Sequence, residues 1–302
     1  MSLSVIIPTR NRKIQLKKLV NYLLNNFREI NRIIIVDSSD NLVNKANFLN
    51  NSKVIYISSD IKSAAIQRNI GLSYLKPKCK FVAFLDDDVR PPLDYFKKLI
   101  LLLQRNNVVG ASGIALNPKN NKSFKKIKAF DAYRAFFYLD SKKEGIVLNS
   151  GINIPFAWSP DKNLISESKW LIGCAVWDYQ KIKTCQFDNR FIGQSLGEDV
   201  LFSLKASKYG KLLVNRNLVL KHLESNINRP NYLNHTRMWV RNRFYISEEL
   251  IGNKMKISYH WCNFGRLLTI FFYSPKYPAK FLYGLIGIIL GYIDLIKDRY
   301  AR

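Results

Sequence analysis

The sequence predicts an α/β fold, with a mainly parallel, Rossmann-like sheet flanked by helices and a basic, apolar helical appendage at the C-terminal end. Short apolar runs alternate with helical patterns over residues 1–106, as in β-α-β units. Carboxylates gather where those runs end, and ligands bind at the carboxyl ends of parallel strands. The chain of 302 residues carries a net charge of +26, so we expect phosphate-bearing partners.

The first part of the chain alternates strand and helix patterns in a regular way. The strands are apolar along their whole length, as expected for strands covered by helices on both faces. Helical segments have apolar residues three or four positions apart. The predicted strands are residues 3–8, 32–37, 53–58 and 80–88, and the predicted helices are residues 11–27, 41–51, 63–75 and 93–106.

Beyond residue 106 the pattern becomes irregular. The Lys- and Asn-rich residues 117–128 predict a solvated loop, and the stretch 168–177 predicts a returning buried strand. Glu198 opens a helix that runs to about Lys208, where the acidic residues suit the helix N-terminus. A last strand is predicted at residues 212–223, with His222 at its end.

The C-terminal part changes character again. Residues 226–302 hold 12 Lys and Arg against 4 Asp and Glu, and the run 281–293 has no charge. At 13 residues this run is short for a membrane span. Residues 281–296 suit the surface of an anionic membrane, and the alternative is a helix packed on protein.

We therefore predict one domain at residues 1–225 and a helical, membrane-associating segment at residues 226–302. The first domain divides into a nucleotide-binding half at 1–106 and an acceptor-binding, catalytic half at 107–225. Four scattered cysteines and only a five-residue apolar stretch near the N-terminus favour a reducing compartment without a secretory signal. The expected location is the cytoplasm, peripheral on the inner face of the cell membrane.

Three adjacent carboxylates, Asp86, Asp87 and Asp88, follow a buried strand. Their mutual repulsion grows in the low dielectric of a strand end, so something positive must compensate for it. A metal ion, a basic side chain or plain solvation would each do so. Asp37 and Asp60 follow neighbouring strands and converge on the same edge, although a helix N-cap is an equal alternative for Asp60.

Five motifs along the chain resemble those of the family 2 glycosyltransferases, which have the GT-A fold. The resemblance covers roughly residues 3–223, and the motifs occur in the family's order and spacing. Each motif is weak alone, and the five together are a strong signal. The motifs are SVIIPTRNR (4–12), IIIVDSSD (33–40), SAAIQRNIGL (63–72), FVAFLDDDVRPP (81–92) and LGEDVLFSLKASKYG (196–210).

The resemblance implies a nucleotide-sugar site at the strand ends. Asp37 would read the nucleobase, but Ser38-Ser39-Asp40 stands where the family usually has Asp-Gly-Ser. Arg68 would bind the diphosphate or a carboxylate, because a guanidinium group is planar and permanently charged. The remaining implied donor-binding residues are Pro8, Thr9, Arg10, Asp86 and Asp87.

The resemblance also implies a metal ion and a catalytic base. Asp88 and Asp86 form the D-x-D motif, which would hold Mg²⁺ or Mn²⁺, ions that prefer hard oxygen ligands. His222 would be a third ligand or a structural histidine. Asp199 would be the general base that deprotonates the acceptor, with Glu198 orienting it. Alternatively, both acids only stabilise a helix N-terminus.

The predicted function is an inverting, metal-assisted transfer of a sugar from a UDP-, GDP- or dTDP-linked donor to a lipid-linked or cell-surface polysaccharide acceptor. The main alternative is a nucleic-acid-binding protein, because residues 237–244 interleave Arg with aromatic side chains. No nucleic-acid module is recognisable, so we do not expect that partner. A nucleotidyltransferase or nuclease and a catalytically silent relative are weaker alternatives. Trp177 would stack on a sugar or belong to the core.

Overall fold

In the computed structural model, the described residues are 2–41, 51–116, 128–157, 165–223, 230–252, 254–272, 275 and 277–300. Most of the predicted helix at 41–51 and of the predicted loop at 117–128 lies outside the described residues.

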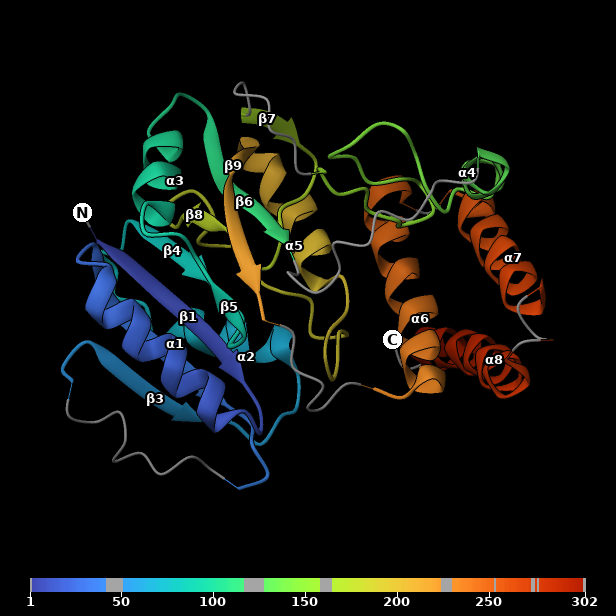
Figure 1. Ribbon diagram of the computed structural model, residues 1–302, viewed down its shortest axis with the longest axis horizontal. Helices are drawn as coiled ribbons and strands as arrows, with labels where there is room; N and C mark the ends of the chain where they lie inside the picture. Colours follow the sequence, from blue (N-terminus) through green and yellow to red (C-terminus); the bar gives the residue numbers. More distant parts are fainter. Residues whose placement is uncertain are drawn as a thin grey trace. The chain divides into compact units, whose positions relative to one another are not determined.

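A nine-stranded mixed sheet forms the first part of the fold (Figure 1). The first four strands of the order β3-β2-β1-β4 run parallel, as the apolar runs predict. Helices α1, α2 and α3 follow strands β1, β3 and β5 along the chain. The bounds are β1 Leu3–Thr9, α1 Lys13–Asn26, β2 Ile30–Asp37, β3 Val54–Ser58, α2 Ala64–Ser73, β4 Phe81–Phe84, β5 Val89–Arg90 and α3 Tyr95–Leu103.

The sheet continues through strands that come later in the chain. Strand β8 runs antiparallel between β4 and β6, and β6 pairs with β9 in parallel. Strands β5 and β7 pair with β9 antiparallel. The predicted fold class is thus confirmed. The bounds are β6 Val108–Leu116, β7 Ile165–Ser168, β8 Val176–Asp178, α5 Glu198–Ala206, a 3₁₀ turn at Ser207–Tyr209 and β9 Lys211–His222.

Two details of the second half differ from the prediction. Strand β6 was missed, because its glycines weaken the strand signal. A Cβ at Gly110 would lie 2.5 Å from the ring of Trp177, so glycine is required where the sheet packs against this ring. Only the ends of the predicted strand at 168–177 are strand residues: 169–175 form a loop that joins the short strands β7 and β8. Trp177 is 2% exposed and packs on Phe202, so it belongs to the core.

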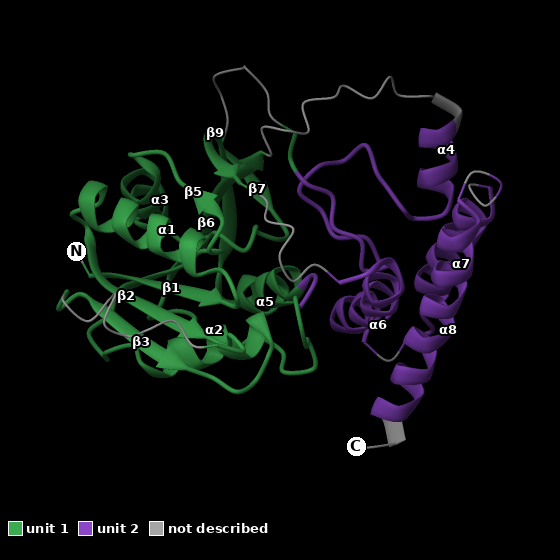
Figure 2. Cartoon of the chain, turned by 60° about the horizontal axis from the view of Figure 1, so that its bottom comes forward, with its two compact units in different colours: residues 1–122, 156–194, 198–228 green, residues 123–155, 195–197, 229–302 purple. Residues whose placement is uncertain are grey.

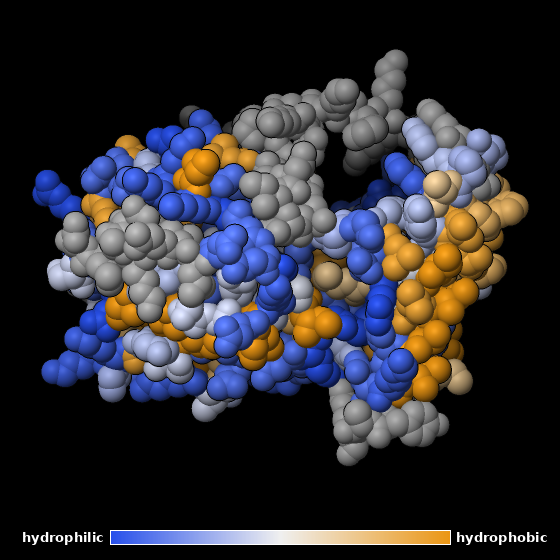
Figure 3. Space-filling view, turned by 90° about the horizontal axis from the view of Figure 1, so that it is seen from below, coloured by the Kyte–Doolittle hydropathy of each residue, from blue (hydrophilic) through white to orange (hydrophobic). Residues whose placement is uncertain are grey.

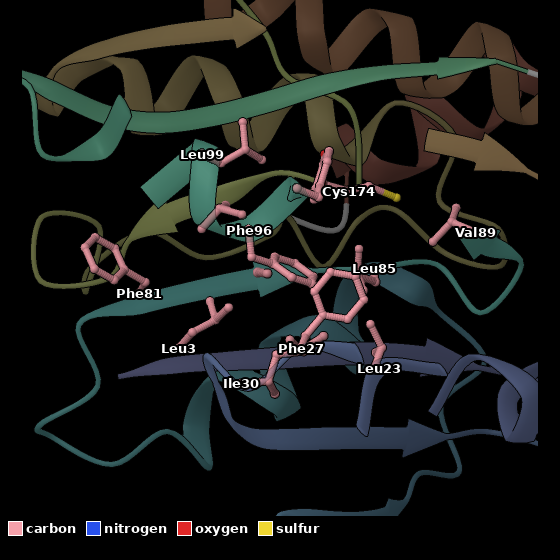
Figure 4. Close-up of a cluster of buried hydrophobic side chains, with 14 of the residues drawn as sticks. Leu3, Leu23, Phe27, Ile30, Phe81, Leu85, Val89, Phe96, Leu99 and Cys174 are labelled. Carbon is pink, nitrogen blue, oxygen red and sulfur yellow. The ribbon is translucent and has the colours of Figure 1, made fainter. Parts of the chain in front are cut away.

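The main core lies between the sheet and its helices (Figure 4). Phe27 and Phe96 meet edge to face with ring centroids 5.0 Å apart, a favourable geometry for aromatic pairs. Leu3, Leu85 and Cys174 are buried in the same cluster. This packing explains why the strand segments are apolar along their length, and it holds the strand ends in fixed positions.

The chain divides into two compact units (Figure 2). The sheet unit comprises residues 1–122, 156–194 and 198–228, and the helical unit comprises 123–155, 195–197 and 229–302. Residues 123–155 group with the C-terminal helices, whereas the sequence-based division assigned them to the catalytic half. The helices of the second unit are α4 Lys128–Phe136, α6 Tyr232–Ile251, α7 Ile257–Phe272 and α8 Pro278–Tyr300.

Helix α8 has two different faces. Glycines allow α6 to approach closely: a Cβ at Gly287 would lie 2.8 Å from the carbonyl oxygen of Leu233. The acids of α8 also bind α6, since Asp294 accepts two hydrogen bonds of 2.6 Å from Arg237. By length and composition, residues 278–298 could cross a membrane. The most apolar 18-residue window of this segment has a mean hydropathy of 1.7, and 28% of that window is buried.

Candidate active site

The carboxyl ends of β1, β2 and β4 meet at one edge of the sheet, and a side chain from α2 ties two of them together. Gln67 Nε2 donates to the carbonyl oxygens of Thr9, at 2.8 Å, and Val36, at 2.6 Å. Gln67 is buried, so these bonds satisfy a polar group that would otherwise be costly. Sequence reasoning missed Gln67. It stands in a polar run with Arg68 and Asn69, so its own pattern gives no signal.

Asp87 and Asp88 share one arginine. Arg12 Nη1 lies 2.8 Å from Asp87 Oδ1 and 3.0 Å from Asp88 Oδ2. Thr9 Oγ1 donates to Asp87 at 2.7 Å. Burial raises the pKa of Asp87 to about 6, although Arg12 and Thr9 oppose the rise. Arg12 thus supplies part of the positive charge that the adjacent carboxylates require. Its role was not expected from the sequence.

His222 lies beside Asp88, with Nε2 3.1 Å from Oδ1. These residues are 134 positions apart, and backbone pairing brings them together. Val89 of β5 is the register partner of His222 in β9, and the amide of Leu223 donates to the carbonyl oxygen of Asp88 at 2.8 Å. The structure therefore places the predicted histidine against the predicted metal-binding carboxylate.

A second arginine, Arg68 of α2, links Asp86 to Glu198. Arg68 Nη2 lies 2.7 Å from Asp86 Oδ1, and Nη1 ion-pairs with Glu198. The arginine side chain is only 2% exposed. Burial raises the pKa of Glu198, and the positive charge of Arg68 opposes this rise. Arg68 thus pairs with carboxylates in this structure, one of the two roles that the sequence predicts.

Asp199 lies in the first turn of α5, next to Glu198. Its Oδ1 accepts a hydrogen bond of 2.8 Å from the amide of Val200, which is the local role expected of an acid at a helix N-terminus. The charge of Asp199 also acts on both Arg68 and Glu198. The carboxylate of Asp199 therefore shares an electrostatic environment with Asp86.

Among the described residues of this edge, Arg12 and Arg68 face a larger number of carboxylates: Asp86, Asp87, Asp88, Glu198 and Asp199. Asp88 offers a hard oxygen ligand of the kind that Mg²⁺ and Mn²⁺ prefer, and these ions keep other positions for water and phosphate oxygens. The imidazole nitrogen of His222 is a ligand that Mn²⁺ accepts more readily than Mg²⁺ does. The residues present therefore fit a divalent cation. Asp86 is directed to Arg68 instead, and the described part of the chain contains no group of three or more side chains placed to hold a metal.

The other predicted donor-site residues lie at the same edge. Pro8 is in β1 opposite Val36 of β2, and Arg10 lies 3.3 Å from Asp40. Asp37 is fully buried, and its carboxylate accepts hydrogen bonds from Ser39 and Tyr56. In this structure Asp37 thus organises the turn after β2.

Comparison with protein families and solved structures gives two kinds of match. The model of glycosyl transferase family 2 matches residues 4–161. A search of curated proteins finds no match. A structure titled GalNAc-T7 with UDP, GalNAc and Mn²⁺ is similar at a TM-score of 0.57 and 14% identity, covering 88% of this chain and 55% of that one.

Two further structures are covered over most of their length. TarS 1-349 of S. aureus in complex with UDP-GlcNAc has a TM-score of 0.52 and 15% identity, over 96% of this chain and 81% of that one. The mannosyltransferase PcManGT of Pyrobaculum calidifontis, in complex with GDP-Man and Mn²⁺, has a TM-score of 0.55 and 10% identity, over 98% and 87%. At these identities the likeness shows a shared fold.

Proposed function

Because the chain belongs to glycosyl transferase family 2, we propose that it transfers a sugar from a nucleoside diphosphate sugar to an acceptor hydroxyl, assisted by a divalent cation and with inversion at the sugar. One observation carries this proposal: Asp88, His222, Asp86, Arg68 and Glu198 converge at the carboxyl ends of the strands. Structures of similar fold hold UDP or GDP-Man together with Mn²⁺, which supports the donor class.

On the donor side, Asp88 and His222 would hold Mg²⁺ or Mn²⁺, which when bound neutralises the charge of the leaving diphosphate. The protein contributes position, because strand pairing fixes both ligands. Asp86 and Arg68 border the same edge, and the guanidinium group orients the Asp86 carboxylate. Thr9 and Asp37 fix the backbone turns on which the nucleotide would lie.

On the acceptor side, Asp199 is the proposed general base. A base must lie within hydrogen-bonding distance of the proton that it removes, and Asp199 occupies the first turn of α5 with part of its side chain exposed. Glu198 is engaged by Arg68, so we assign it an orienting role. A base opposite the leaving diphosphate gives direct displacement, hence inversion.

The proposed acceptor is lipid-linked or part of a cell-surface polysaccharide. The helical unit carries an apolar surface (Figure 3). Its exposed apolar side chains include Phe271, Phe272, Leu282, Ile289 and Ile296. Apolar side chains set among an excess of Lys and Arg suit an anionic membrane surface, so we propose peripheral attachment on the cytoplasmic side of the membrane.

A thermal-shift titration would test this function. UDP, GDP, dTDP and CDP would each be added with and without Mn²⁺, to the native protein and to Asp88→Asn. A ligand that binds only the folded state raises its stability. We expect one nucleotide to raise the melting temperature only with Mn²⁺, and the variant to lose the shift. Folded protein that responds to no nucleotide would contradict the proposal.

A further inference from the structure

The helical unit contains a cavity of about 410 Å³ that the proposed donor site does not use. This volume lies in the range of small-molecule pockets, roughly 300–1,000 Å³. Helices α4, α6 and α7 supply most of its walls. The walls are mainly aromatic and aliphatic, and they also contain three arginines. The aromatic and aliphatic residues include Phe130, Ile152, Tyr232, Trp239 and Ile270. The arginines are Arg134, Arg243 and Arg266.

Arg266 is the decisive side chain in this cavity. Its guanidinium carbon lies 4.2 Å from the ring centroid of Trp239, and Nη2 reaches Thr236 Oγ1 only at 3.5 Å. Its Nε is buried without a hydrogen-bond partner. No ion pair forms between Arg266 and any residue that the structure describes. The side chain as a whole is half-buried, and a partly desolvated charge without an opposite charge is still costly.

The other two arginines of the cavity bind groups of their own. Arg243 Nη1 donates to the carbonyl oxygen of Gly151 at 2.7 Å and to Asn153 Oδ1 at 2.8 Å. Arg134 pairs with Asp140 at 3.1 Å, but no acidic residue is among the described residues that line the cavity. Among the described residues, the cavity therefore combines apolar walls with the positive charge of Arg266, which no carboxylate compensates.

The positive potential reaches beyond the cavity wall. Burial lowers the pKa of His235, and the charges of Arg266 and Arg243 lower it further. Burial also lowers the pKa of Arg266 itself, although an arginine stays charged at neutral pH. An anion bound inside the cavity would raise the pKa values of both His235 and Arg266.

We propose that this cavity binds the phosphate group of an amphiphilic phosphate ester, with the arginines on the phosphate and the aromatic and aliphatic walls on its apolar body. A phosphate dianion matches several guanidinium groups better than a single carboxylate does. The walls explain why the ligand is an ester rather than the free ion. That this ester is the acceptor rests on the proposed function; the binding site itself does not.

Calorimetric titration with geranyl phosphate would test the site. Geraniol, which lacks the charge, and inorganic phosphate, which lacks the apolar body, serve as matched probes. We expect geranyl phosphate to bind and both other probes to bind at least about tenfold more weakly, because each lacks one half of the recognition. The assignment would be overturned if either geraniol or inorganic phosphate bound as tightly as geranyl phosphate.

The variant Arg266→Gln isolates the charge. We expect it to weaken geranyl phosphate binding about tenfold or more, and Arg266→Lys to recover part of the loss. Lys254→Gln is the control, because Lys254 is an exposed cation of the same unit, and it should bind as the native protein does. Equal binding by Arg266→Gln and the native protein would overturn the proposal.

Two readouts keep this test separate from folding and from the proposed function. Removing a half-buried charge that no carboxylate compensates should leave the melting temperature unchanged or raise it, so a large fall would indicate a purely structural arginine and contradict the proposal. Nucleotide binding with Mn²⁺ should be the same in Arg266→Gln as in the native protein. Native protein that binds geranyl phosphate but no nucleotide would refute the donor site and leave the cavity assignment standing.

Discussion

The strand edge of the sheet unit and the cavity of the helical unit have opposite charge imbalances. At the strand edge, Arg12 and Arg68 each bind two carboxylates, so the acids in these described contacts outnumber the arginines. In the cavity, Arg266 lacks a carboxylate among the described residues. A buried imbalance is costly to fold, so each region indicates the charge of the ligand that would complete it.

The two regions also differ in how they are built. Most of the acids at the edge lie at strand ends that the sheet core holds in place, whereas three helices supply the arginines of the cavity. The first arrangement suits a metal site, which needs precise ligand geometry. The second suits an apolar body carrying one anionic group. Three variants of the acidic edge and one charge-balanced control would test this difference.

The largest effect is expected for Asp88→Asn. The variant removes a negative ligand from the pair with His222, so Mn²⁺-dependent nucleotide binding should be lost and transfer should fall by about 10³-fold or more. Calorimetry with and without Mn²⁺ would measure the binding. Unchanged Mn²⁺-dependent binding would show that the excess acids at this edge do not serve a metal ion.

Asp199→Asn separates base catalysis from donor binding. Removing a general base should lower the transfer rate by about 10²- to 10⁴-fold and leave Mn²⁺-dependent nucleotide affinity nearly intact, because the base acts only in the transition state. Rapid-quench assays and calorimetry on the same preparation would measure both. Full transfer activity would refute the assignment of Asp199.

Arg12→Gln tests whether Arg12 and a metal ion compete for Asp88. Without metal, the variant should lose about 2–3 kcal/mol of the free energy of unfolding, because it leaves two buried carboxylates without their cation. Mn²⁺ should then stabilise the variant more than it stabilises the native protein. Urea unfolding with and without Mn²⁺ would measure the difference, and an equal gain in both would contradict competition.

Asp188→Asn is the charge-balanced control and carries the smallest effect. Burial alone would raise the pKa of Asp188, but hydrogen bonds from Arg190 and the charge of Lys205 outweigh it and lower the pKa to about 2. Because the folded-state pKa is depressed, this stabilisation, about 1–2 kcal/mol, is present above about pH 4 and is lost as the pH falls toward 2. Neither Mn²⁺ nor geranyl phosphate should change it.

Unfolding measured at pH 7, 4 and 3 would follow the difference between Asp188→Asn and the native protein. We expect the difference to shrink on acidification. A difference that stays constant over this range would show that the ionised carboxylate of Asp188 is not the stabilising group.

The parallel half of the fold was predictable because its signals are local. Each strand of the order β3-β2-β1-β4 is a continuous apolar run, and apolar spacing marks the helices between them. Strand β6 was not predicted. Its Gly110 is required by close packing against the ring of Trp177, which lies 67 positions away in the sequence. Such a requirement comes from tertiary packing and leaves no local pattern.

The candidate site divides in the same way. Asp86, Asp87 and Asp88 are adjacent in sequence and follow a buried strand, so their clustering was visible. Arg12 was not singled out, because one arginine among 48 Lys and Arg residues does not stand out. The arginines of the cavity are spread from Arg134 to Arg266 and were hidden for the same reason.

Strand β5 consists of two residues, and its pairing with β9 is what brings Asp88 and His222 together. So short a ladder opens easily by local unfolding. Each opening would separate Asp88 from His222. A cation bound to both side chains would therefore stabilise the closed ladder. Amide hydrogen exchange at Leu223, whose amide bonds to Asp88, should therefore slow when metal and nucleotide bind. Retention of the donor would then depend on the closing equilibrium of a few backbone hydrogen bonds.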